Sequence, residues 1–166
     1  MALKRDASLV RLSRDHHRGL VWGMRFAREL PTANEAEVAA LYAEFLLFWE
    51  SGLLPHFRAE CECLLARLAR RLAGQGDVLA RTQSDHLEIN SLMAGVRDDD
   101  DPVVRRQALA EIGDLLRKHI RWEESVLFEL TQTALTERDL AALAADVAER
   151  IPEMPPPPPW PGHQAG

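Results

Sequence analysis

The stretches His56-Phe-Arg-Ala-Glu60 and His119-Ile-Arg-Trp-Glu123 each place a histidine four residues ahead of a glutamate. Both stretches lie within the apolar periodicity of a helix, and residues four apart share one helix face. Each stretch therefore offers an imidazole and a carboxylate side by side. Because a buried carboxylate needs a cation or a donor to offset its lost hydration, two such faces turned to one centre predict a metal site.

The apolar periodicity predicts four long helices and a short fifth one, over residues 8–30, 34–72, 77–96, 102–130 and 137–150. Asn34 and Asp77 are expected to cap the second and third helices. Gly52 and Pro55 interrupt the second and predict a kink or local irregularity just before His56. Because short connections favour antiparallel neighbours, the sequence predicts an all-α fold. We expect an up-and-down antiparallel four-helix bundle over residues 1–150, with the short fifth helix against it.

Composition bounds the classes of function that the chain can have. At 166 residues it is long enough for one domain with a sizeable core. A formal net charge of −6 argues against a nucleic-acid-binding surface, because no net positive field attracts phosphates. The chain shows no apolar run typical of a secretion signal or of a membrane span. We therefore expect a cytoplasmic protein without a membrane or nucleic-acid partner.

Two further features have both a functional and a plainer interpretation. Cys61 and Cys63 sit two apart in a predicted helix, where their side chains diverge, so a disulfide is excluded. A redox or metal-ligand role is one interpretation, and small residues filling space at a helix interface is the favoured one. Residues 151–166 hold seven of the ten prolines and form a Pro-rich C-terminal tail, extended or disordered. This tail is either a solvated terminus, which is favoured, or a docking segment for a protein partner.

Histidines on the first and third helices complete the predicted site. His86 lies on the apolar stripe of the third helix, and each main helix thereby supplies one histidine. Counting residues from the turn near 75, however, places His56 and His86 at levels that differ by about 12 Å at 1.5 Å per residue. Helix tilt, the irregularity at Pro55 and loop geometry have to absorb that difference.

On the first helix the choice between His16 and His17 is open, because neighbours in sequence point about 100° apart and only one can face the centre. His16 is modestly favoured, since it aligns with the apolar side. Glu124, one position past the ligand phase, is expected at the rim of the site or behind its ligands. The predicted metal ligands are His16, His56, Glu60, His86, His119 and Glu123, with His17 as the alternative to His16.

These motifs, in this order, resemble a known family. Arg14-Asp-His-His17, His56-Phe-Arg-Ala-Glu60, Ser84-Asp-His86 and His119-Ile-Arg-Trp-Glu123 together look like the hemerythrin-like, or HHE cation-binding, domain. The resemblance implies a four-helix bundle around a non-haem di-iron centre, in which histidines cap the irons and the two carboxylates bridge them. Many members carry a second histidine one turn before the one on the third helix. That position is Thr82 here, so the site is expected to be open or to hold a single iron.

A nitrogen-rich site with two carboxylates suits iron better than magnesium or calcium, and an under-coordinated iron has room for a small ligand. The sequence therefore predicts a non-haem iron protein that binds or senses dioxygen or nitric oxide. The alternative is an oxidoreductase that acts on peroxide or nitric oxide, or an iron donor for iron-sulfur cluster repair. The absence of a Glu-x-x-His spacing argues against a ferritin-like site, and the absence of His-Glu-x-x-His argues against a zinc protease helix.

Overall fold

A computed structural model describes residues 4–72, 74 and 76–151. Within these ranges the chain is helical and contains no strand, which confirms the predicted all-α class. The elements are η1 (Ala7–Leu9), α1 (Val10–Glu29), α2 (Glu35–Phe48), η2 (Trp49–Leu53), α3 (Leu54–Ala59), η3 (Glu60–Leu65), α4 (Ala66–Arg71), α5 (Gly76–Asp98), α6 (Pro102–Trp122), η4 (Glu123–Leu127), α7 (Phe128–Ala134) and α8 (Glu137–Arg150). The predictions for the Pro-rich tail fall almost entirely on residues outside these ranges.

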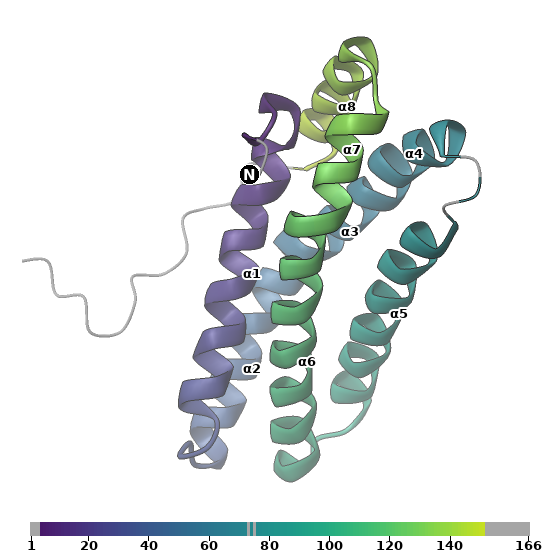
Figure 1. Cartoon of the computed structure of the whole chain (residues 1–166). Coiled ribbons are helices and arrows are strands. Elements are labelled where there is room, and N and C mark those ends of the chain that lie inside the picture. Colours follow the sequence, from purple (N-terminus) through teal and green to yellow (C-terminus); the bar gives the residue numbers. More distant parts are fainter. Residues whose placement is uncertain (1–3, 73, 75, 152–166) are drawn as a thin grey trace, which may run out of the picture.

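Consecutive elements join end to end into four long rods that lie side by side as a helical bundle (Figure 1). The first rod is α1, the second runs from α2 to α4, the third is α5, and the fourth runs from α6 to α7. The fourth rod packs against each of the other three, most extensively against α1 and α5. The short fifth helix α8 packs against η1, α3 and η3 at one end of the bundle.

The helix starts follow local capping chemistry. The Asn34 side chain accepts from the Glu37 N–H while the Glu37 side chain accepts from the Asn34 N–H, which confirms Asn34 as the cap of α2. Asp101 accepts from the first turn of α6, where Pro102 fits the first helical position. The prediction that Asp77 caps the third helix is wrong, because α5 begins at Gly76. Asp77 lies instead in the first turn, where its charge still suits the helix dipole.

Three π-helical turns interrupt the second and fourth rods. The irregularity expected just before His56 is one of them, η2, in which the N–H of Leu54 bonds to the carbonyl of Trp49, five residues back. The other two were not predicted, and each begins at a candidate ligand: η3 at Glu60 and η4 at Glu123. A π turn inserts a residue into the helix and re-aims the faces that follow, and such turns are frequent at functional sites.

Two hydrophobic clusters make up the core. The first cluster lies at the end of the bundle near α8 and includes Leu12, Leu64 and Phe128. The second cluster includes Phe26 and Ile112. On the first and fourth rods the candidate ligand residues lie between members of the first cluster and members of the second, and on the second rod the change of cluster falls between His56 and Glu60. A polar layer therefore crosses an otherwise apolar interior.

The first and fourth rods approach closely where two glycines meet. A Cβ added at Gly23 would stand 2.8 Å from the backbone oxygen of Gly113, closer than real Cβ contacts allow. The absence of side chains there brings α1 and α6 together, and this close approach fixes the position of His16, two turns from Gly23, relative to the fourth rod.

One helical stretch, Glu35–Arg71, is by length and composition apolar enough to cross a membrane, with a window of mean hydropathy 1.2 that is 33% buried. A helix in the core of a soluble protein meets the same criterion, so this is weak support for a span. In this chain the stretch also carries His56 and Glu60, both buried.

Candidate metal centre

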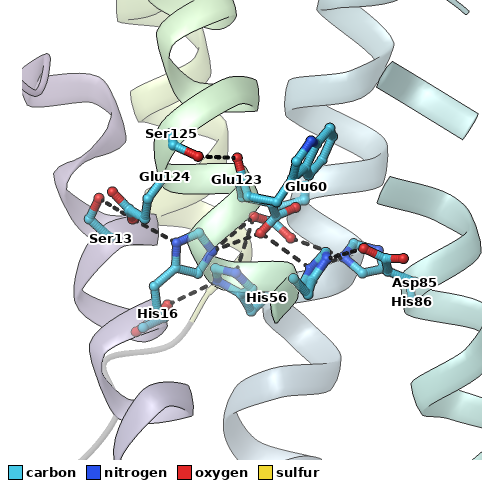
Figure 2. Close-up of polar contacts among 12 residues, drawn as sticks. Ser13, His16, His56, Glu60, Asp85, His86, Glu123, Glu124 and Ser125 are labelled. Atoms are coloured by element: carbon cyan, nitrogen blue, oxygen red, sulfur yellow. Dashed lines mark hydrogen bonds and ion pairs between the residues drawn. The ribbon is translucent and has the colours of Figure 1, made fainter. Parts of the chain in front are cut away.

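Six polar side chains meet in the layer between the two hydrophobic clusters (Figure 2). They are the six predicted ligands, and none is more than 4% exposed. We call them the His/Glu cluster: His16, His56, Glu60, His86, His119 and Glu123. The first and third rods supply one histidine each, and the second and fourth supply a histidine and a glutamate each. The structure thus brings together every side chain in the predicted set, including His56 and His86.

The two glutamates are common to two overlapping sets of donors. In the first set His16 and His56 join Glu60 and Glu123, and in the second His86 and His119 join the same two glutamates. Within each set one ligand atom from every residue lies within 4.8 Å of the others. The cluster is therefore laid out as two neighbouring four-residue positions that share two carboxylates.

The donor atoms stand at the separations expected around metal ions. The Nε2 atom of His16 lies 3.0 Å from a Glu123 oxygen, and that of His119 lies 3.2 Å from the same oxygen. The Nε2 atoms of His56 and His86 lie 3.2 and 3.3 Å from the two different oxygens of Glu60. Neighbouring ligands of an ion held at about 2.1 Å stand about 3 Å apart. The spacing fits donors that share an ion.

Unsatisfied polar atoms in the cluster point to the same conclusion. Five buried atoms lie close together but have no hydrogen-bond partner among the described residues: both carboxylate oxygens of Glu60, both of Glu123, and the Nε2 of His16. Leaving several such atoms without partners is costly in an apolar interior. A cation between them would satisfy all of these atoms at once, so the residues present fit a metal centre.

The structure separates the two candidates on the first rod. His16 is buried in the cluster, whereas its neighbour His17 is exposed and lines an open groove of about 640 Å³ on the outside of α1. Thr82, one turn before His86, is fully buried, and its hydroxyl donates to the backbone oxygen of Val78. No protein donor from this position therefore reaches the cluster.

Each imidazole turns its Nε2 atom to the cluster and its Nδ1 atom to a different outer partner. The Nδ1 of His16 lies 2.7 Å from Glu124, which also accepts from Ser13 and Arg5. Glu124 thus lies behind His16, one of the candidate ligands, at the place that the sequence suggested.

The other three outer partners were not identified from the sequence. The Nδ1 of His56 lies 3.6 Å from Asp15, and that of His119 lies 3.1 Å from Asp85. The Nδ1 of His86 lies 3.5 Å from the sulfur of Cys61, so Cys61 is more than the space-filling residue that the sequence favoured. Such partners fix the ring orientation and the tautomer of a metal-binding histidine.

A signal for the two aspartates is present in the sequence. An Asp-His dipeptide occurs at Asp15-His16 and again at Asp85-His86. In both cases the histidine enters the cluster, and the aspartate lies beside the Nδ1 atom of the histidine on the neighbouring His-x-x-x-Glu rod. The repeated dipeptide therefore marks the two rods that supply no glutamate to the cluster.

The charged groups of the cluster shift one another's pKa values. Burial by itself would lower the pKa of His56, but the charge of Glu60 and the close contacts with Glu60 and Asp15 raise it to about 9. Burial also opposes the charge of His16, yet its contacts with Glu123, Glu124 and Glu60 raise its pKa well above the ordinary value. Burial would raise the pKa of Glu60, and the imidazoles around it hold that pKa well below its usual range. Protonated imidazoles therefore balance the buried carboxylates when no metal ion does.

A helical bundle with a buried layer of histidines and shared carboxylates is typical of a helical domain that binds cations. Comparison with protein families makes the identification specific: the model of the hemerythrin HHE cation-binding domain matches residues 8–131. The chain belongs to this family, which confirms the resemblance seen in its motifs. No curated protein and no solved structure gives a significant match.

Proposed function

We propose that the chain is a non-haem iron protein that holds two iron ions in the His/Glu cluster. The observation that carries the proposal is the pair of donor sets that share Glu60 and Glu123. His16 and His56 would hold one ion, His86 and His119 would hold the other, and the two glutamates would contact both. Imidazole and carboxylate donors in this mixture suit iron, whereas magnesium and calcium prefer oxygen donors alone.

We further propose that this centre binds or senses dioxygen or nitric oxide. Iron supplies the affinity for these diatomic molecules when it has open coordination positions. Each of the two positions has two histidines and the two shared glutamates, and Thr82 adds no donor. The chain's own residues orient the donors and exclude water by the apolar clusters on either side.

Iron content and the optical spectrum of protein purified from cells test the proposal. We expect about two iron ions per chain and charge-transfer absorption in the oxidised protein. Glu60→Ala should lose both, because it removes a donor common to the two positions. His17→Ala, a change to an exposed histidine next to a ligand, should retain both. Wild-type protein without bound iron after growth in iron-supplemented medium would contradict the proposal.

A second class of function uses the same site. The oxidoreductase alternative, with peroxide or nitric oxide as substrate, and the donation of iron for iron-sulfur cluster repair both need open positions and exchangeable metal. Steady consumption of peroxide or nitric oxide by the iron-loaded protein, lost in Glu60→Ala, would favour the enzyme. Reversible binding without consumption would favour the carrier or sensor.

We infer that the four rods form an up-and-down antiparallel four-helix bundle. The course of the chain in Figure 1 supports this arrangement, since successive rods run in alternating directions. We also propose a cytoplasmic location, an interpretation supported by the sequence alone.

A further inference from the structure

The surroundings of the cluster repeat in two halves. In each half, the aspartate of an Asp-His dipeptide lies at the Nδ1 atom of a histidine in a His-x-x-x-Glu motif: Asp15 at His56, and Asp85 at His119. The residue that directly follows each shared glutamate completes the pattern. Glu124, after Glu123, contacts the Nδ1 atom of His16, and Cys61, after Glu60, contacts that of His86.

Cys61 therefore occupies, in one half, the place that Glu124 occupies in the other. The Nε2 atom of His86 also contacts Glu60 and His119, but on the cluster side of the ring, so on the outer side Cys61 is joined only by the ring stacking of Phe57 among the contacts of the described residues. Phe57 stacks on the ring with centroids 3.9 Å apart and an interplanar angle of 18°. Stacking fixes the plane of the ring. It is nearly unchanged when the ring flips by 180° within that plane, so it does not distinguish Nδ1 from the ring carbon that would take its place. The contact with the Cys61 sulfur does, since only a nitrogen can hydrogen-bond to it.

A thiol and a carboxylate differ as partners of an imidazole that binds metal. When Nε2 binds a cation, Nδ1–H donates outward. Glu124 offers a charged oxygen at 2.7 Å, and charge-assisted hydrogen bonds are about twice as strong as neutral ones. Cys61 offers sulfur, a weak acceptor, at 3.5 Å. The imidazole of His86 consequently gains less basicity from its outer partner than the imidazole of His16 gains.

We propose that Cys61 is the positioning residue of His86 and that its thiol makes the His86/His119 metal position the weaker of the two. The proposal rests on the proposed function, because it requires two ions in the cluster. It predicts that the positions fill in order, first the one at His16 and His56, then the one at His86 and His119. The second ion is then the exchangeable one.

Titration of the metal-free full chain with Co²⁺, followed by its visible spectrum and by competition with a chelator, tests this. We expect two binding steps in the wild type. Cys61→Ala should weaken the second step about tenfold and leave the first unchanged, the usual effect of losing an outer partner. Cys61→Asp, which places a carboxylate where the other half has one, should strengthen the second step above wild type. Cys63→Ala is the matched control, since Cys63 is buried in the apolar cluster.

A spectroscopic signature separates positioning from packing. In the Co²⁺-loaded protein the imidazole N–H protons give exchangeable, strongly shifted proton resonances. Cys61→Ser should move one of these resonances and leave those of the other histidines in place, whereas Cys63→Ala should move none. Equal affinities and unchanged resonances in all the Cys61 variants would overturn the proposal while leaving the metal site intact. Wild-type protein that binds fewer than two Co²⁺ ions would instead overturn the proposed function.

Discussion

Metal binding to this chain should release protons. In the metal-free protein His56 has a pKa of about 9, and the pKa of His16 is also raised, because both imidazoles face buried glutamates. A metal ion needs the lone pair of a neutral imidazole nitrogen, so it must displace the proton that each of these residues carries at neutral pH. The affinity for the metal should therefore depend on the pH at which binding is measured.

The size of the effect follows from the pKa of His56. At pH 7, two units below that pKa, removal of its proton costs about 2.7 kcal/mol, at about 1.36 kcal/mol per unit, which weakens binding about 100-fold. From pH 7 towards pH 9 the apparent affinity should rise about tenfold per pH unit from this residue alone. His16 acts in the same direction and steepens the rise.

Calorimetric titration with Co²⁺ in two buffers of different ionisation enthalpy counts the protons released. We expect at least one proton per chain at pH 7 and a smaller number as the pH approaches 9. His17→Ala should behave like the wild type, because His17 is exposed and outside the cluster. An affinity independent of pH, with no proton release at pH 7, would contradict this prediction, since the imidazoles of the metal-free protein would then already be neutral.

Three further predictions concern stability and the outer partners. The raised pKa of His56 stabilises the metal-free folded protein. This stabilisation is fully present below pH 6.5, the pKa of histidine in the unfolded chain, and is lost as the pH rises through about 9. The urea concentration at the midpoint of unfolding should therefore fall between pH 7 and 10. Asp85→Asn should weaken Co²⁺ binding 10- to 100-fold by chelator competition, because it removes the charge beside the Nδ1 of His119, and an unchanged affinity would exclude that role. Gly23→Ala should lower the free energy of unfolding, measured in urea, by about 1–3 kcal/mol, because the added methyl group would meet the backbone oxygen of Gly113. Gly95→Ala, at a position with open space on α5, should instead raise this free energy by about 0.5–1 kcal/mol. Equal effects at the two glycines would contradict the close approach of α1 and α6.

The sequence predicted the helices and the six members of the cluster because both depend on local spacing. A histidine four residues ahead of a glutamate shares its face wherever the helix lies. The outer partners follow a different rule. Asp15 and Asp85 each contact a histidine on another rod, and Cys61 contacts one 25 residues away. Contacts between rods depend on how the rods are rotated and offset, which helical periodicity within one rod does not determine.

The relative heights of His56 and His86 depend on the packing of the rods in the same way. Counting residues from the turn near 75 at a constant rise placed His56 and His86 about 12 Å apart in height, yet both imidazoles contact Glu60. A constant rise holds only for regular helices that lie parallel. The second rod contains the π turn η3 between His56 and the end of α4, and the extra residue in such a turn removes about 1.5 Å of the difference. The larger part of the difference is left to the tilt of the rods and to the connection between them.

The repeated Asp-His dipeptide would have settled the choice between His16 and His17. In the third rod, the histidine of the cluster, His86, directly follows Asp85 in the sequence. If the two halves of the site are equivalent, the histidine of the first rod must directly follow Asp15, and this residue is His16. The same equivalence assigns the residue after each shared glutamate to the Nδ1 atom of that histidine, which accounts for Glu124 and Cys61 together. A two-fold pattern in the sequence therefore carries information about contacts between rods that periodicity lacks. The one place where the pattern changes chemistry, from carboxylate to thiol, is where the two metal positions should differ.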